Sequence, residues 1–573
     1  MKNYLTLTCA FLLSIMNCSA QYYNWITGGG SDETMTPGYN YENVTNMCTD
    51  SKGNVYITAT VGRSNVRADT FYELSTHNAF SSNAHVLFAS YKCDGTMRWA
   101  KIIESSNETF IGHVLDGVGN SGIAYSNGSV YTVGVFYGGT KYIGNDTSFT
   151  DNNLSFIARF DTLGHMKWIR MIGPDVASTS TLTGDAGTIA VDGAGYIHNF
   201  NSMKAGVALS TTFTTDTNGT YDLKYDTMGN LVSANRVKLD SSWTILKVVF
   251  NKNNGKYYAV LVPDASYWYT YHANQNTAIC SFLPDGHINW MDTTGPNGDV
   301  YSLAYDNRNG IYTCGRGQYP DTFSLGGISV TDTAFPTYYA FATIFKLDTN
   351  GHGHWVYNLQ SNLGVDRFLD ICLLPGSKIA AVGVLAGTSI RGRDTIVATP
   401  GELSNPLFLV LDSLGNTLKL DQLHGPGNDD QGSCLAADQG SNIYIGGMLD
   451  ATMNATGLTA YSSNGGNTDY YLVKYGFNDC DTLIPLSAPA TLTNGYPTQV
   501  SVYPNPATEE LNIKGVTEES TYQVLDITGK PWCKGLLQPG PNTISTKNLQ
   551  PGLYLIDITQ KDGTKQIIRL VIE

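Results

Sequence analysis

The chain has 573 residues, which is too long for one ordinary compact core and predicts at least two domains. Charged residues make up only 14% of it, and it contains 60 Gly and 36 Tyr. This composition is typical of an extracellular β-rich protein and disfavours a cytosolic helical enzyme. The formal net charge of −15, without basic clusters, disfavours a nucleic-acid partner, because phosphate binding needs many Lys and Arg contacts.

The first twenty residues have the pattern of a secretory signal peptide. Lys2 supplies the positive start, Leu5–Met16 is an apolar run, and Cys18–Ala20 places small residues at a cleavage site. We expect the mature chain to begin at Gln21. The alternative, lipid attachment at Cys18, is disfavoured because the residues before that cysteine are not small. The apolar run is too short to span a bilayer and no later run is longer, so no transmembrane segment is expected.

One short phrase recurs along the chain, with a Gly four residues before a Trp. The complete copies contain the pairs Gly95 and Trp99, Gly164 and Trp168, Gly286 and Trp290, and Gly351 and Trp355. Two degraded copies carry Ser233 and Lys419 in the Trp position. A recurrence this regular indicates a repeat architecture.

Each phrase belongs to a longer unit that also contains an alternating strand after an Asn-, Asp- or Gly-rich turn, as in DSKGNVYITATVG and DQGSNIYIGGML. The aligned turn positions are Asn54, Ser129, Gly195, Lys256, Gly310, Lys378 and Asn442. Their spacing leaves room for four strands and loops, and no segment has sustained helical periodicity. Seven such units predict an all-β fold with a seven-bladed β-propeller, in which the Trp packs between neighbouring blades.

The two ends of the repeat region complement each other. The seventh unit stops without its Trp strand, whereas the mature N-terminus, YYNWITGGGSDE, is a Trp strand around Trp25 without a preceding unit. We expect this N-terminal strand to complete the last blade and close the ring, which leaves no open sheet edge. The units resemble the bacterial SBBP-type repeats over Gln21–Phe477. That resemblance implies a propeller fold and little about activity.

The amino-acid composition changes after the repeats. Residues 478–498 are rich in Pro, Thr, Ser and Ala and have the composition of a linker. Short alternating strands with Pro and Gly turns follow to the end of the chain and predict a small β-sandwich. They contain YPNPATEELNI, VLDITGK and NLQPGLYLI in that order.

These ordered motifs resemble the type A C-terminal sorting domain of cargo for the type IX secretion system in Bacteroidetes. The resemblance implies export across the inner membrane by the signal peptide, outer-membrane passage by this domain, and then release or attachment at the cell surface. The chain departs from the family at Glu573, where many members end in a basic residue. The alternative is an ordinary accessory sandwich domain. The matching sorting-signal residues are Pro504, Asn505, Pro506, Gly552 and Tyr554.

The predicted domains are a signal peptide at 1–20, a propeller at 21–477, a linker at 478–498 and a sorting domain at 499–573. No compact catalytic motif occurs: H-E-x-x-H, G-x-S-x-G, the phosphate loop and the dinucleotide fingerprint are all missing. The cysteines show no C-x-x-C spacing, so a zinc site is not indicated, and their pairing stays open. The histidines between repeat Gly and Trp fall on different blades, where exposed turn positions are expected; they are His165, His287, His352 and His354.

Acidic loops follow the Trp strands. Their candidate metal-binding carboxylates are Asp32, Asp175, Asp299 and Asp429. In a propeller these loops emerge on one face, where carboxylates could bind Ca²⁺ or, in a closely placed pair, cleave a glycosidic bond. The alternative is that these Asp residues only form turns with backbone N–H groups.

An aromatic cluster is the other candidate site. It comprises Tyr267, Trp268, Tyr269 and Tyr271. Aromatic faces stack on sugar rings, although packing between blades would also explain them. The sequence thus predicts a secreted or surface-attached propeller that binds a glycan or protein ligand without catalysis. Alternatives are a polysaccharide-acting enzyme with its site in the propeller funnel, and a structural or adhesive surface component.

Overall fold

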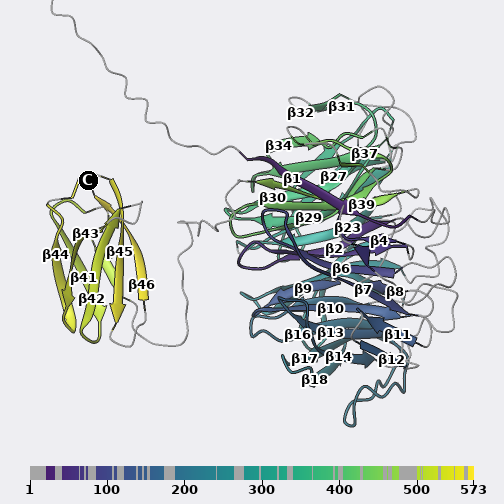
Figure 1. Ribbon diagram of the computed structural model, residues 1–573, viewed down its shortest axis with the longest axis horizontal. Helices are drawn as coiled ribbons and strands as arrows, with labels where there is room; N and C mark the ends of the chain where they lie inside the picture. Colours follow the sequence, from purple (N-terminus) through teal and green to yellow (C-terminus); the bar gives the residue numbers. More distant parts are fainter. Residues whose placement is uncertain are drawn as a thin grey trace, which may run out of the picture. The chain divides into compact units, whose positions relative to one another are not determined.

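The computed structural model is all-β in the residues that it describes, as predicted (Figure 1). Within them, no helix could cross a membrane. Two compact units are present, Met1–Leu486 and Ser487–Glu573. The described residues are 21–32, 42–62, 65–69, 73–74, 85–105, 109–111, 122–136, 140–144, 147–150, 155–172, 187–240, 242–263, 277–295, 298–306, 308–318, 322–331, 340–363, 366–391, 394–397, 404–425, 427, 430–455, 458, 461–462, 468–476, 500–503, 505, 507–526, 531–547, 549–550, 552–560 and 565–572.

Among the described residues, the first unit contains seven antiparallel sheets of four to six strands, which are numbered in chain order, and four two-stranded hairpins. Sheet 1 comprises β2 (Asn43–Thr49), β3 (Val55–Val61), β6 (His85–Tyr91), β7 (Met97–Ser105), β11 (Thr140–Ile143) and β12 (Thr147–Thr150). Sheet 2 comprises β8 (Thr109–Ile111), β9 (Ile123–Ser126), β10 (Ser129–Phe136), β13 (Ser155–Asp161) and β14 (Met166–Ile172). Sheet 3 comprises β15 (Thr188–Val191), β16 (Ile197–Met203), β17 (Gly219–Tyr225) and β18 (Leu231–Arg236).

Sheets 4 to 7 each have four strands. Sheet 4 comprises β19 (Trp243–Asn251), β20 (Lys256–Pro263), β21 (Ala278–Phe282) and β22 (Ile288–Thr293). Sheet 5 comprises β23 (Gly298–Tyr305), β24 (Gly310–Gln318), β27 (Ala340–Asp348) and β28 (Gly353–Leu359). Sheet 6 comprises β29 (Arg367–Leu374), β30 (Lys378–Leu385), β33 (Asn405–Leu411) and β34 (Thr417–Gln422). Sheet 7 comprises β35 (Gln431–Ala437), β36 (Ile443–Leu449), β39 (Asp469–Gly476) and β1 (Tyr22–Gly29).

Sheet 7 joins the two ends of the repeat region. Its outermost strand is β1, which pairs antiparallel with β39 from Tyr22 opposite Gly476 to Gly29 opposite Tyr470. The predicted addition of the N-terminal strand to the last unit is therefore confirmed. This pairing covers an edge of β39 that would otherwise expose unpaired backbone groups.

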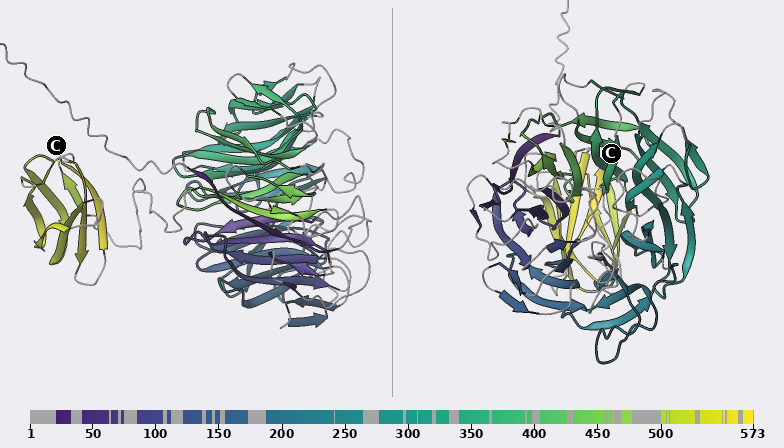
Figure 2. Two further views of the ribbon diagram at one scale, coloured as in Figure 1. Left: turned by 45° about the horizontal axis from the view of Figure 1, so that its top comes forward. Right: turned by 90° about the vertical axis from the view of Figure 1, so that its right-hand side faces the viewer.

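The sheets follow one another around a ring, seen end-on in the right-hand view of Figure 2. We call β2, β9, β15, β19, β23, β29 and β35 the innermost strands. Each of them contacts the next in this order, and β35 contacts β2. The hydrophobic core is divided among the interfaces between adjacent sheets, such as the cluster that joins Tyr56 of sheet 1 to Phe156 of sheet 2.

Short hairpins accompany these sheets. They are β4 (Val66–Arg67) with β5 (Glu73–Leu74), β25 (Phe323–Leu325) with β26 (Ile328–Val330), β31 (Ser389–Arg391) with β32 (Asp394–Ile396), and β37 (Thr452–Met453) with β38 (Tyr461–Ser462).

The second unit has two antiparallel sheets that share one apolar core. One comprises β40 (Ser501–Tyr503), β41 (Glu510–Val516) and β44 (Gly540–Ser545). The other comprises β42 (Ser520–Asp526), β43 (Pro531–Leu537), β45 (Gly552–Gln560) and β46 (Lys565–Ile572).

The repeated Trp forms the same contact at five interfaces. Its ring lies beside a Tyr of its own sheet, with ring centroids 6.0 to 6.3 Å apart. The pairs are Trp25 with Tyr444, Trp99 with Tyr56, Trp168 with Tyr131, Trp290 with Tyr258, and Trp355 with Tyr312. Each pair covers the interface with the following sheet, as predicted for the Trp.

Each of these Trp side chains also binds the outer turn of the following sheet. Trp99 Nε1, for example, donates to Thr162 O at 3.1 Å. In that turn Gly164 has a φ of 83°, and a Cβ there would lie 2.7 Å from the Trp99 ring. Glycine is thus required both by the left-handed backbone and by the close approach of the indole. This contact explains why the Gly and the Trp recur together: the Trp of one unit packs on the Gly of the next.

Two interfaces lack the Tyr–Trp pair. At sheet 6, Lys419 occupies the Trp position, and its Nζ lies 5.7 Å from the centroid of the Tyr475 ring. The following sheet has no outer turn to bind, because β39 and β1 are distant parts of the chain. The loss of Trp at this position therefore follows from the way the two chain ends meet. The other exception, at sheet 3, is described below.

We expect Trp99→Ala to lower the free energy of unfolding of the first unit by about 2 kcal/mol, because a half-buried indole loses its apolar contacts and its hydrogen bond. Chemical denaturation followed by circular dichroism measures this. Trp532→Ala is the control, since that indole is 45% exposed and lies in the second unit. An equal, small effect of both substitutions would contradict the assigned role of Trp99.

Candidate functional site

Five of the innermost strands contain a β-bulge among their described residues. It falls at Thr45, Leu246, Tyr301, Leu369 and Ser433. A bulge inserts one residue and changes the direction of the side chains that follow. The next residues are polar or small, namely Asn46, Lys247, Ser302, Asp370 and Cys434. Local sequence alone does not reveal this set, because the bulge is defined only by the partner strand.

Asp370 links four successive innermost strands through its side chain. Its Oδ1 accepts from Lys247 Nζ of β19 at 3.0 Å and from Ser302 Oγ of β23 at 2.6 Å. Its Oδ2 accepts from the Leu435 N–H of β35 at 3.0 Å. Asp370 is buried and Lys247 is nearly so. Asp370 and Lys247 therefore form a buried ion pair, and the three hydrogen bonds that Asp370 accepts join these strands to one another.

A second polar group lies where the innermost strands begin. Arg316 Nε donates to Asp299 Oδ2 at 2.9 Å, and the Tyr301 hydroxyl donates to the same oxygen at 3.3 Å. Arg367 donates to Gln431 Oε1 at 3.3 Å. Burial raises the pKa of Asp299, while Arg316 and Arg367 oppose that shift. We call these five residues the inner-end cluster.

Two atoms of the inner-end cluster are buried without a hydrogen-bond partner among the described residues. They are Asp299 Oδ1 and Arg367 Nε. A buried carboxylate oxygen and a buried guanidinium nitrogen each cost free energy when unpaired. The cluster therefore contains one acceptor and one donor that could bond a small polar molecule able to reach its buried interior.

Other acidic residues near the starts of the innermost strands have structural partners. Glu42 accepts from Ser31 N, Ser31 Oγ and Gly62 N at 2.8, 2.6 and 2.6 Å. Asp366 accepts from Ser361 N, Ser361 Oγ and Ala386 N at 2.5, 2.9 and 2.9 Å. Both carboxylates are fully buried. Each ties the segment after an outermost strand to the end of a second strand. No sequence motif marks either residue; the local signal is an acid placed one residue before an innermost strand.

The predicted metal-binding carboxylates are not brought together by the described residues. Asp32 is exposed and accepts from Asn65 Nδ2 at 2.7 Å, whereas Asp299 is buried against Arg316. Asp175 and Asp429 lie outside the described residues. In the described part of the chain, no group of three or more His, Cys, Asp or Glu side chains is arranged to hold a metal ion. A Ca²⁺ site at these positions stays a prediction.

The remaining predicted residues fall into three groups. The aromatic cluster of Tyr267, Trp268, Tyr269 and Tyr271 lies outside the described residues, as do Pro504 and Pro506. In the second unit, Asn505 is described, Gly552 begins β45, and the buried Tyr554 donates to Gln550 O at 2.9 Å. The repeat histidines His165, His287 and His352 are exposed and lie within 3.2 Å of an Asp of their own turn, and His354 is exposed too. The seven described cysteines are free thiols.

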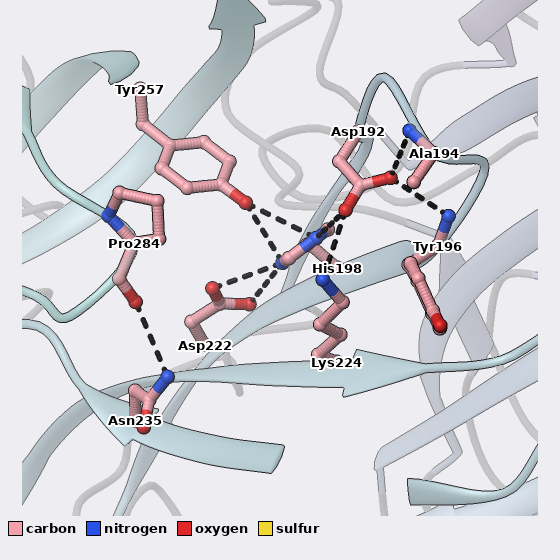
Figure 3. Close-up of polar contacts among 9 residues, drawn as sticks. All are labelled: Asp192, Ala194, Tyr196, His198, Asp222, Lys224, Asn235, Tyr257 and Pro284. Carbon is pink, nitrogen blue, oxygen red and sulfur yellow. Dashed lines mark hydrogen bonds and ion pairs between the residues drawn. The ribbon is translucent and has the colours of Figure 1, made fainter. Parts of the chain in front are cut away.

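A buried histidine interrupts the pattern at the interface between sheets 3 and 4 (Figure 3). His198 of β16 occupies the position that Tyr56 has in sheet 1, because each lies six residues after the Asp of its turn. Its Nδ1 lies 2.8 Å from Asp222 Oδ1, and its Nε2 lies 3.3 Å from Asp192 Oδ2. No sequence motif marks this residue.

The comparisons with known proteins identify one part of the chain. Residues 501–573 match the family model described as "Secretion system C-terminal sorting domain". No curated protein matches the chain. The second unit is therefore a sorting domain of the type IX secretion system, as the motifs predicted, and the protein is exported to the cell surface or secreted.

Solved structures resemble the chain only weakly. PorZ, a surface component of the type IX secretion system of Porphyromonas gingivalis, has 10% identity and a TM-score of 0.23, with 92% of this chain and 81% of that chain covered. A puromycin-hydrolyzing peptidase of Mycobacterium tuberculosis has 10% identity and a TM-score of 0.38, with 87% and 61% covered. The GH74 enzyme of Niastella koreensis has 10% identity and a TM-score of 0.28, with 96% and 93% covered. These similarities do not distinguish a binding protein from an enzyme.

Proposed function

We propose that the seven sheets form a seven-bladed β-propeller of the SBBP repeat type, closed by β1 and delivered by its sorting domain after cleavage of the signal peptide behind Ala20. The cyclic contacts of the innermost strands and the pairing of β1 with β39 support the closed ring. The Tyr–Trp pairs support the repeat, because the same contact recurs at five interfaces. A ring of this kind is a rigid frame that presents loops to a partner.

The function that we propose is non-catalytic binding of a glycan or protein ligand at the cell surface or in the medium. The observation that favours binding is the inner-end cluster, where Asp299 Oδ1 and Arg367 Nε lack partners among the described residues. A sugar hydroxyl or a peptide amide can donate to the first atom, and a hydroxyl or carbonyl oxygen can accept from the second. The aromatic cluster around Trp268 would add stacking surface for a sugar ring.

The second candidate is an enzyme that cleaves polysaccharide with a carboxylate pair in the propeller funnel. Glycoside cleavage requires two carboxyl groups that face one bond and remain free to transfer protons. The described acids near the starts of the innermost strands are engaged instead: Asp299 by Arg316, Glu42 by Ser31 and Gly62, and Asp366 by Ser361 and Ala386. These contacts favour binding over cleavage.

We expect purified protein to be retained on at least one member of a polysaccharide panel, with the polysaccharide unchanged in mass. Arg367→Gln should lower the affinity about tenfold, because one hydrogen-bonding group at the inner end is removed. Lys167→Gln is the matched control, since Lys167 is an exposed cation on the outer strand β14. Retention measured with and without Ca²⁺ tests the predicted metal site, and Trp268→Ala tests the aromatic cluster.

The outcomes separate the candidates. Shortened polysaccharide would exclude a purely binding role and direct attention to the acidic loops. Retention that Arg367→Gln leaves unchanged but Trp268→Ala abolishes would move the site from the inner end to the aromatic cluster. No retention on any glycan would instead favour a protein partner or a structural role.

A further inference from the structure

The interface between sheets 3 and 4 replaces aromatic side chains by ionisable ones. In sheet 1, Tyr56, Ser90 and Trp99 lie opposite one another on successive strands. At the same register positions sheet 3 has His198, Lys224 and Ser233. Two residues before Ser90 lies Phe88, whereas two residues before Lys224 lies Asp222. A Tyr–Phe–Trp set that packs by apolar contact is thus replaced by His, Asp and Ser.

The ionisable side chains at this interface form one connected group (Figure 3). His198 lies between two carboxylates, Asp222 beside Nδ1 and Asp192 beside Nε2. Lys224 Nζ donates to Asp192 Oδ2 at 3.0 Å and lies 4.1 Å from the centroid of the Tyr196 ring. From sheet 4, the Tyr257 hydroxyl lies 2.9 Å from His198 Nδ1. The titratable groups that face His198 are therefore Asp192, Asp222, Lys224 and Tyr257.

Only a protonated imidazole can donate a hydrogen bond to both carboxylates at once. A carboxylate only accepts hydrogen bonds, so each ring nitrogen must carry a proton to bond its own carboxylate. With the imidazole protonated, the positive charges of His198 and Lys224 balance the negative charges of Asp192 and Asp222. Loss of the proton leaves one buried carboxylate facing a nitrogen lone pair and gives the group a net charge of −1. Both His198 and Asp222 are buried, so water compensates poorly for this loss.

The usual outer contact between the two sheets is also absent here. Ser233 occupies the Trp position, and the turn of sheet 4 is held instead by Asn235 Nδ2, which donates to Pro284 O at 3.2 Å, and by the Lys238 N–H, which donates to Gly286 O at 2.8 Å. These bonds bury less apolar surface than an indole does. The ionic group around His198 lies beside the apolar cluster of this interface, which includes Phe200, Tyr257 and Phe282.

We propose that the contact between sheets 3 and 4 is controlled by the proton on His198, which closes the interface when bound and loosens it when lost. The equivalent position of sheet 1 does not respond in this way. In sheet 1 the same position is held by Tyr56, whose hydroxyl donates to Asp50 Oδ2 at 2.9 Å. Burial raises the pKa of Tyr56, so that hydroxyl keeps its proton through the neutral range.

The direction of the pH response follows from the group's environment. Burial lowers the pKa of His198, but the bonds to Asp192 and Asp222 outweigh burial and raise the pKa above its ordinary value. A raised pKa in the folded state means that the stabilisation is complete below about pH 6.5, the pKa of an unperturbed His, and is lost as the pH rises through the folded pKa. Burial raises the pKa of Asp222 despite the opposing contacts with His198 and Lys224, so this carboxyl also binds a proton more tightly in the folded state than in the unfolded one.

Hydrogen exchange measured by mass spectrometry tests the proposal on the full secreted chain between pH 6 and pH 9. After correction for intrinsic exchange, protection of the β16 and β20 amides should fall above the folded pKa of His198, by up to about tenfold per pH unit for one proton. Amides of β24 and β30, at the apolar interface between sheets 5 and 6, serve as the internal reference and should keep constant protection. A parallel fall in every sheet, or none in β16 and β20, would overturn the proposal.

Two substitutions distinguish the effect of the His198 proton from the effect of side-chain packing at this interface. His198→Gln removes the titrating group, and His198→Tyr restores the repeat residue, whose hydroxyl can donate to Asp192. Both variants should show flat protection in β16 and β20 across the same pH range, and His198→Tyr should be the more stable of the two. His165→Gln is the matched control, because His165 is exposed and contacts only its own turn. A pH response that persists in both His198 variants would show that another group controls the interface.

Discussion

Removal of the N-terminal strand is expected to have the largest effect on the first unit. A chain that starts at Ser31 loses every pair of β1 with β39, and it loses the hydrogen bond from Trp25 Nε1 to Cys93 O at 2.7 Å. The exposed edge of β39 would then present unpaired N–H and C=O groups. We expect the shortened chain to form oligomers or to unfold, because the ring can no longer close around sheet 7.

Light scattering after gel filtration, together with thermal unfolding, measures this effect. A synthetic peptide of residues 21–31 supplied in trans should restore part of the monomer, since strand addition to an open edge needs only main-chain bonds and side-chain pockets. A scrambled peptide is the control. A shortened chain that remains monomeric with an unchanged Tm would contradict the role assigned to β1.

The second large effect is expected from Asp370→Ala. This substitution removes the acceptor for Ser302 Oγ and the Leu435 N–H, and it leaves Lys247 as a nearly buried charge without its partner. Breaking a buried ion pair on one side costs about 3–5 kcal/mol. We expect a fall of that size in the free energy of unfolding, measured by denaturant titration.

A double substitution tests the reason for that loss. Lys247→Met combined with Asp370→Leu removes both charges and should recover most of the stability, because the unpaired charge is the main cost. Lys167→Ala at the exposed pair with Asp161 should change the stability by less than about 1 kcal/mol. If the single and double substitutions at the buried pair were equally destabilising, shape and packing would be responsible, not charge.

The repeat pattern predicted much of the first unit correctly. The alternation of apolar and polar residues placed the strands, and the Asp-x-x-Gly turns set the hairpins, since both signals are local. The unmatched Trp strand around Trp25 predicted that β1 completes sheet 7, and the pairing confirms it. The sorting-domain motifs predicted the identity of residues 501–573, because short ordered motifs remain recognisable in sequence.

The sequence pattern predicted less about the candidate sites. Asp299 was singled out from its acidic loop, but its pairing with Arg316 required knowledge of which strands are neighbours. His198 drew no attention because a single His in a strand carries no distinctive signal. Only its alignment with Tyr56, and the presence of Asp222 and Tyr257 from other strands, shows that it replaces a structural aromatic residue.

The sequence by itself determined the all-β class, the repeat with its recurring Gly and Trp, the joining of the two ends and the exported destination. These properties are encoded in local periodicity and short motifs, which act over a few residues. Only the tertiary structure decided that each Trp packs on the turn of the following sheet, that Asp370 joins four innermost strands, and that His198 lies between two carboxylates. Apart from the contact of His198 with Asp192, six positions away, those contacts join residues 24 to 123 positions apart. Their energies depend on distance, burial and register, which the linear order of residues does not contain.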